Sequence, residues 1–178
     1  MTSQGKTNWI FFPKSEEPPQ LAREVVAVFE RAAAEIERRF DETVSDVVLE
    51  IARPGLEEIG FEVESGKTTE QKIRVPVLFG LNGRVEKAFD ADAWHRDGKM
   101  VLEVEAGRGY LNNQFLKDLF QACMMHDVDY CAIAIRNQYI KSRDFDKVVS
   151  FFETLYASGR LQLPLKGVLI IGYSRADS

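Results

Sequence analysis

Two pairs of acidic residues, each with one residue between its members, stand out in this chain of 178 residues. One pair is Asp90 and Asp92, and the other is Glu103 and Glu105, on the next predicted strand. Residues two apart in a strand point to the same face, so Glu103 and Glu105 share one face while Val104 and its apolar neighbours fill the other. If the two strands form a β-hairpin, up to four carboxylates converge.

Such a convergence of carboxylates requires compensation. Two carboxylates about 5 Å apart repel by roughly 3 kcal/mol at an effective dielectric near 20, so three or four together need a proton or a cation. A hard divalent cation with oxygen ligands is the natural compensator. The alternative interpretation is that each acidic pair is merely the solvated face of a strand.

Length and composition favour a single domain over residues 1–178, in which residues 1–17 form a flexible N-terminal segment. We find no apolar window of about 18 residues and no signal-peptide pattern, so we expect no membrane segment and a cytoplasmic location. The two cysteines, Cys123 and Cys131, have neither disulfide-framework nor zinc-site spacing. The net charge of −5 argues against general adhesion to nucleic acid, although residues 107–147 carry more basic than acidic side chains.

The first part of the chain has helical patterns. Apolar residues at helical spacing fill 21–40, after two prolines that suit a helix N-terminus. A second helical stretch over 45–60 is interrupted by Pro54, so two helices and one broken helix both fit the pattern.

From Phe61 onward the pattern changes to strands and then to alternating strands and helices. An antiparallel meander is predicted by strand patterns with turn signals at Asn82-Gly83 and 96–99; its strands are 61–64, 72–77, 85–95 and 100–106. Helices are expected over 112–126 and 145–156, and buried strands over 130–135 and 167–172. Strand, helix, strand after a meander predicts a mixed α/β sheet with helices on both sides.

This order of elements resembles the PD-(D/E)XK nuclease superfamily, whose restriction-endonuclease-like fold has a mixed central sheet flanked by helices. The segment 92–107, Asp-Ala-Trp-His-Arg-Asp-Gly-Lys-Met-Val-Leu-Glu-Val-Glu-Ala-Gly, is similar to the metal-binding hairpin of restriction enzymes of the BamHI and BglII type. Those enzymes carry glutamate or glutamine in place of the usual lysine of the motif, and Glu105 stands at that position here. The resemblance extends over about residues 45–136.

The resemblance implies a magnesium-dependent endonuclease that hydrolyses phosphodiester bonds in DNA, with Mn²⁺ as a substitute metal. It implies that Asp92 and Glu103 ligate the metal and that Glu105 activates or positions the attacking water. Asp90, two residues before Asp92, is a candidate for an additional or alternative ligand.

The resemblance also suggests a further acid and a DNA-contacting surface. Many members carry a glutamate on the helix before the meander, for which Glu50 is the candidate and Glu57 or Glu58 are competitors. Residues near a helix N-terminus or in a loop can reach the DNA backbone. The candidates for DNA contact are Arg108, Asn112, Lys117, Lys141 and Arg143.

Restriction enzymes of this type generally work as dimers, so the resemblance implies a homodimer in which each subunit cuts one strand of a duplex. An alternative function is a catalytically degenerate protein that keeps the fold and acts as a DNA-binding or scaffolding subunit; the missing lysine and the acidic net charge motivate it. A third alternative is an unrelated α/β domain whose acids are only a solvated face.

Overall fold

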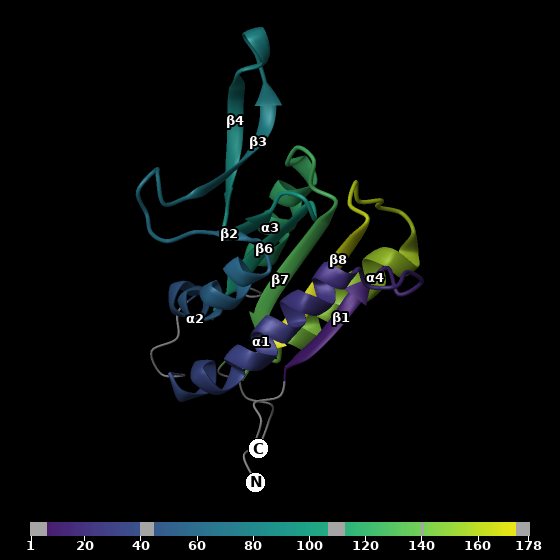
Figure 1. The fold of residues 1–178 in the computed structure, drawn as a ribbon. Helices are drawn as coiled ribbons and strands as arrows, with labels where there is room; N and C mark the ends of the chain where they lie inside the picture. The colour runs from purple at the N-terminus through teal and green to yellow at the C-terminus, as the bar shows by residue number, and fades with distance from the viewer. Residues whose placement is uncertain (1–6, 40–44, 107–112, 140, 174–178) are drawn as a thin grey trace.

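A mixed sheet of six strands forms the centre of the molecule (Figure 1). The structure is a computed structural model, and it describes residues 7–39, 45–106, 113–139 and 141–173. The strands of this sheet are β1 (Asn8–Phe12), β2 (Glu62–Val63), β5 (Ala93–His95), β6 (Met100–Glu105), β7 (Tyr130–Arg136) and β8 (Gly167–Tyr173). Their order is β1-β8-β7-β6-β5-β2; β6, β7 and β8 are parallel, and the other pairings are antiparallel.

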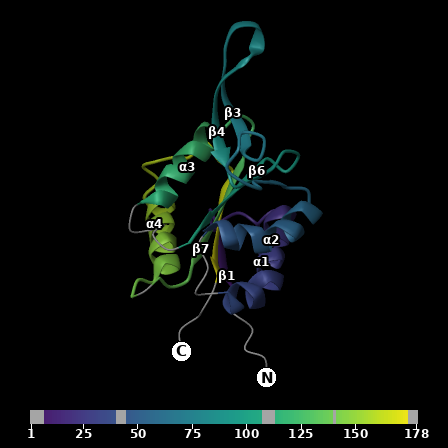
Figure 2. The same ribbon diagram turned by 90° about the vertical axis from the view of Figure 1, so that its left-hand side faces the viewer.

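Two layers of helices cover this sheet, one on each face (Figure 2). The helices α1 (Gln20–Arg38) and α2 (Ser45–Glu58) pack on one face, and α3 (Gln114–Met124) and α4 (Asp144–Ser158) pack on the other. α2 is one helix that contains Pro54, which decides between the two interpretations of that stretch. The predicted mixed sheet flanked by helices is therefore confirmed. None of the helices in the described ranges has the length and apolar character needed to cross a membrane.

The N-terminal segment differs from the expectation of flexibility over residues 1–17. Residues 8–12 are strand β1, which pairs antiparallel with β8 along its whole length. Phe11 and Phe12 are buried on opposite faces of the sheet, in its two separate cores. Burial of these rings, together with the ladder of backbone hydrogen bonds, fixes this part of the segment.

A second, two-stranded sheet projects from the body of the molecule (Figure 1). It consists of β3 (Ile73–Phe79) and β4 (Val85–Ala91), joined by a short 3-10 turn at Leu81–Gly83, and residues 73–91 are called the arm below. The predicted continuous strand over 85–95 is therefore divided. β4 pairs with β3 in the arm, whereas β5 pairs with β2 and β6 in the main sheet, so the chain changes partners at Asp92.

Candidate active site

A cleft of about 570 Å³ lies between the arm, the start of α2, strand β6 and helix α3. All four acids of the two pairs identified in the sequence line it, and three more acids join them from other elements. The acidic lining residues are Asp46, Glu64, Asp90, Asp92, Glu103, Glu105 and Asp118. The basic lining residues are Lys67, Arg74 and Lys117. The fold thus gathers carboxylates from five separate segments of the chain.

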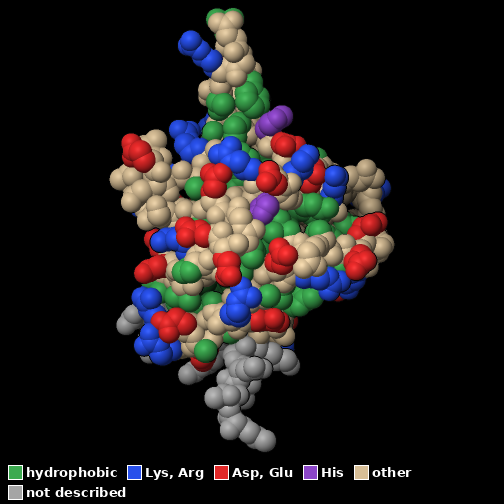
Figure 3. All heavy atoms as spheres, in the orientation of Figure 1, with side chains coloured by type: hydrophobic (Ala, Val, Ile, Leu, Met, Phe, Trp, Pro, Cys, Tyr) green, Lys and Arg blue, Asp and Glu red, His purple; other side chains and the backbone are tan. Residues whose placement is uncertain are grey.

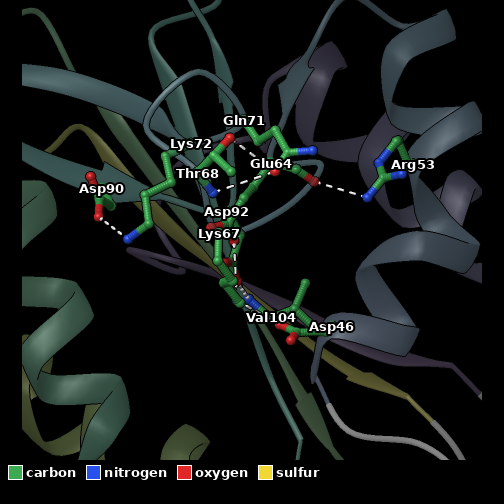
Figure 4. A network of polar contacts seen from close by, with 10 residues as sticks. All are labelled: Asp46, Arg53, Glu64, Lys67, Thr68, Gln71, Lys72, Asp90, Asp92 and Val104. Carbon is green, nitrogen blue, oxygen red and sulfur yellow. Dashed lines mark hydrogen bonds and ion pairs between the residues drawn. The ribbon is translucent and has the colours of Figure 1, made fainter.

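Asp92 and Glu103 are held opposite each other by the backbone of the main sheet. The register pairs Ala93 with Leu102, which places Asp92 across from Glu103. The Val104 backbone N–H donates to Asp92 Oδ2 at 2.7 Å (Figure 4). In return, the Asp92 backbone N–H donates to the Glu103 carboxyl group. Two reciprocal hydrogen bonds therefore position both carboxyl groups without any other side chain.

Burial dominates the electrostatics of this pair. It raises the pKa of Asp92 to about 7, and the nearby charges of Glu64 and Asp118 add to the effect. Glu103 is only 8% exposed, and burial raises its pKa well above the usual range, with Asp92 and Asp118 adding to it. Because a buried carboxylate without a compensating cation favours its protonated form, this pair binds protons more tightly than free carboxyl groups do.

Asp118 on α3, which the sequence analysis did not identify, completes the acidic group. It is buried and its carboxyl group hydrogen bonds to that of Glu105. Two carboxyl groups form such a bond only by sharing a proton; burial and this contact raise the pKa of Glu105 to about 9. Asp118 Oδ2 is buried and accepts no N–H or O–H hydrogen bond from the described residues.

A sequence signal for Asp118 exists in hindsight. α3 presents a polar stripe along an otherwise apolar helix, at positions i, i+3, i+4 and i+7, and it is the next element after the acidic strand. The stripe consists of Gln114, Lys117, Asp118 and Gln121, and all four line the cleft. Lys117, a predicted DNA-contacting residue, therefore lies beside the acids, and its charge partly offsets the rise in the pKa of Glu105.

Asp90 lies on the arm and has different surroundings from the other acids. Its carboxylate pairs with Lys72 Nζ at 2.7 Å and with Arg74 Nε at 3.8 Å. Figure 4 shows the Lys72–Asp90 pair to one side of the Asp92–Val104 hydrogen bond. Two cations already compensate Asp90, so it is a weaker candidate for a metal ligand than Asp92, and its role stays a prediction.

Glu64 and Lys67 are two further cleft residues that the sequence analysis did not identify. Both follow the two-residue strand β2, and the Glu64 backbone N–H donates to the Asp92 carbonyl at 2.8 Å. Lys67 Nζ lies 3.1 Å from Asp46 and 3.9 Å from Glu64. A short irregular segment with such composition gives no periodic signal, so only the tertiary structure places it at the site.

The remaining candidates lie away from the buried acids. Glu50 is exposed on α2 and lines, with Arg53, a neighbouring depression that shares Asp46, Glu64 and Lys67 with the cleft but none of the four central acids. Lys141 and Arg143 are exposed between β7 and α4, outside the cleft lining, and Arg143 Nε pairs with Asp146 at 2.7 Å. Glu57 and Glu58 are exposed at the end of α2, and Arg108 and Asn112 lie outside the described residues.

The donor chemistry of the cleft fits a hard divalent cation. Carboxylate oxygens are the ligands that Mg²⁺ and Mn²⁺ prefer, and Asp118 Oδ2 is a buried acceptor that lacks a donor. In the described part of the chain no three Asp, Glu, His or Cys side chains are already arranged around one point as metal ligands. Without a bound cation, protons are the compensation open to these carboxyl groups, in keeping with the raised pKa values of Glu105 and Asp118.

Comparisons with known proteins were made for sequence and for structure. No family model and no curated protein matches the sequence. Among solved structures, the fold is similar to that of the restriction endonuclease BglII in complex with a DNA 16-mer, with a TM-score of 0.54 and 13% sequence identity. The match covers 96% of this chain and 79% of the BglII chain. This chain therefore has a restriction-endonuclease-like fold.

Proposed function

We propose that this protein is a divalent-metal-dependent endonuclease that hydrolyses phosphodiester bonds in DNA. The main support is the gathering of Asp92, Glu103, Glu105 and Asp118 in one cleft, where Glu103 and Asp118 are buried and the other two are partly buried. A cluster of carboxyl groups with raised pKa values is a costly arrangement that sites of catalysis use. The BglII structure of the same fold contains DNA, which supports DNA as the substrate.

Asp92 and Glu103 are the residues that would hold Mg²⁺ or Mn²⁺, and Asp118, which lines the same cleft, is a candidate for a further oxygen ligand. When bound, the metal supplies a Lewis acid for the phosphoryl oxygen and lowers the pKa of a bound water. The reciprocal backbone hydrogen bonds between strands β5 and β6 keep the two ligand carboxyl groups in place, so little reorganisation is needed.

We assign to Glu105 the role of orienting the attacking water and, in its deprotonated form, of accepting a proton from it. Its carboxyl group is hydrogen bonded to Asp118, so a proton that reaches Glu105 has a second carboxyl group with which it can be shared. Lys117, one residue before Asp118 and also in the cleft lining, supplies a positive charge for the scissile phosphate. Lys117 on α3 and Lys67 after β2 thus provide cations near the site, although Glu105 stands at the motif position that usually carries a lysine.

The experiment that tests this function is incubation of the purified protein with supercoiled plasmid and with single-stranded DNA, in Mg²⁺, Mn²⁺ or chelator. We expect metal-dependent nicking or cutting, and we expect Asp92→Asn to lower its rate at least about 100-fold. That loss is larger than the loss caused by removing a group that only orients a metal ligand. Asp97→Asn is the matched control, since Asp97 is exposed in a turn outside the cleft. Full cleavage by Asp92→Asn would contradict the site.

A degenerate DNA-binding or scaffolding subunit is the second candidate function. The lack of a ready-made three-ligand group among the described residues favours it, as does Glu105 in place of lysine. Such a protein would bind DNA but would show neither cleavage nor specific metal uptake. Calorimetric titration with Mn²⁺ therefore separates the two candidates.

Asp118→Asn and Glu50→Gln form an informative pair of variants. We expect Asp118→Asn to lower the rate of metal-dependent cleavage at least tenfold. The asparagine amide can still hydrogen bond to Glu105, but the substitution removes one anionic ligand group. Glu50→Gln should leave the rate within about twofold, because Glu50 is exposed and does not line the acidic cleft. Rates over a range of Mn²⁺ concentrations check this; a larger loss in Glu50→Gln would return Glu50 to the catalytic group.

A homodimer is part of the same proposal, in which each subunit cuts one strand of a duplex. Sedimentation velocity over a range of concentrations tests it. A protein that stays monomeric with duplex DNA bound, yet cuts both strands at one position, would contradict the arrangement.

A further inference from the structure

The outer half of the arm (residues 73–91) has no role in the proposed active site, although the root of the arm lines the cleft. It is a two-stranded antiparallel ribbon that stands out from the body in both views (Figures 1 and 2). Its outer half exposes large apolar side chains, and Leu81 at the tip is 81% exposed. Leu78, Phe79 and Val85 are also exposed. Neighbouring apolar side chains that remain in water mark a surface that contacts something else.

The root of the arm is firmly attached to the body. Val75 and Ala91 are buried in the core beneath α3 and α4. The His126 backbone N–H donates to the Pro76 carbonyl at 2.7 Å, and the Phe79 ring packs edge-on against His126 with ring centroids 5.0 Å apart. The arm is therefore anchored to the body as far as Phe79, and its tip projects away from the body in the space-filling view (Figure 3).

Cations alternate with the apolar side chains along the outer half of the arm. Arg84 and Lys87 are exposed, and Lys87 lies across the ribbon from Leu78. Arg84 forms no ion pair with any other described residue, and Glu86 is the single acid between Phe79 and Lys87. Lysine is depleted in the cores of protein–protein interfaces, whereas Arg and Lys are among the side chains that contact phosphates in protein–DNA interfaces.

The position and reach of the arm fit a duplex bound in the cleft. Its root lines the cleft through Arg74 and Phe89, so the ribbon begins beside the proposed site of cleavage. At about 3.3 Å per residue, the seven steps from Arg74 to Leu81 span roughly 20–25 Å. That length corresponds to about six or seven base pairs, and the major groove, about 12 Å wide, admits a two-stranded ribbon.

We propose that the arm is a DNA-contacting ribbon that lies along a duplex to one side of the scissile phosphate. Arg84 and Lys87 contact phosphates, and Leu81 enters the groove. This inference rests on the proposed function, and it specifies double-stranded DNA as the form of the substrate.

The test measures DNA binding in the Glu103→Gln background, in which cleavage does not interfere. Fluorescence anisotropy with a labelled duplex gives the Kd over a series of salt concentrations. The double variant Arg84→Gln/Lys87→Gln should bind at least tenfold more weakly, and its slope of log K against log salt should fall by about 2, since each lost phosphate contact removes about 0.9. Leu81→Ser should weaken duplex binding severalfold without changing the slope, and should weaken single-stranded binding less.

The matched control is Arg31→Gln/Arg160→Gln, which removes two exposed cations outside the arm and the cleft lining. Equal affinity and slope for the arm variants and the parent would overturn the inference, and so would equal losses in the control and the arm variants. A change in sedimentation of the arm variants with unchanged DNA affinity would overturn it in favour of a protein interface. If the unsubstituted protein cuts DNA and the arm variants bind DNA as tightly as Glu103→Gln alone, only this inference fails. If the unsubstituted protein neither binds nor cuts DNA, the proposed function itself fails.

Discussion

Replacement of Glu103 by glutamine should abolish metal-dependent DNA cleavage while it raises the thermal stability of the metal-free protein. Burial raises the pKa of Glu103 well above its usual range, so the folded protein disfavours the charged form of this side chain relative to the unfolded chain. Glutamine has a similar shape and carries no charge, so this cost of folding disappears. A gain of about 1–3 kcal/mol corresponds to a rise in Tm of roughly 2–10 °C for a chain of this size.

The control for this variant is Glu57→Gln, which changes an exposed glutamate on α2 and should alter neither property. Thermal unfolding in chelator and cleavage in Mn²⁺ are the two measurements. A marked loss of stability in Glu103→Gln would indicate that the carboxyl group is a structural hydrogen-bonding residue. If Glu103→Gln is more stable but no longer cuts DNA, the Glu103 carboxyl group contributes to function and lowers the stability of the fold.

The metal-free protein should lose stability as the pH rises from about 5 to about 9. Carboxyl groups of an unfolded chain have pKa values near 4, whereas burial in the folded protein raises the pKa of Asp92 to about 7 and that of Glu105 to about 9. Between these values the folded state binds more protons than the unfolded state, so folding weakens with increasing pH. The stabilisation is fully present below the unfolded pKa values and is lost as the pH passes the folded ones.

Within its own window each of these carboxyl groups removes about 1.4 kcal/mol of stability per pH unit, which is a fall in Tm of roughly 3–5 °C per unit. Differential scanning calorimetry at pH 6, 7, 8 and 9 in chelator measures the trend. Millimolar Mn²⁺ should reverse the fall at pH 8, because a cation replaces the protons as the compensating charge. A flat Tm profile in chelator would contradict the burial of uncompensated acids.

Much of the fold could be predicted from the sequence because the buried faces of helices and strands carry apolar residues at regular spacing. The apolar runs at 130–135 and 167–172 are the central strands β7 and β8, and the helical spacing over 21–40 is α1, correct to within a few residues at each end. Pattern alone did not reveal the change of partner at Asp92. Strand β4 and strand β5 have the same alternation, and only tertiary pairing separates the arm from the main sheet.

The candidate site was predictable only in part, for a similar reason. The alternation in β6 correctly places Glu103 and Glu105 on one face, opposite Leu102 and Val104, which pack under α1 and α2. Asp118 belongs to a helix whose orientation against the sheet is a tertiary property, so the polar stripe on α3 marks a polar helix face but does not predict that Asp118 approaches Glu105. The two-residue strand before Glu64 is likewise too short for a periodic signal.

Calorimetric titration with Mn²⁺ at pH 7, repeated in buffers with different heats of ionisation, tests the central claim most directly. It does not depend on a recognition sequence in the DNA, and the buffer series counts the protons released. The site predicts saturable Mn²⁺ uptake with release of at least one proton, lost in both Asp92→Asn and Glu103→Gln and kept in Asp97→Asn. Absence of specific uptake by the parent protein, or uptake that survives both substitutions, would contradict the assignment of these carboxylates as a metal site.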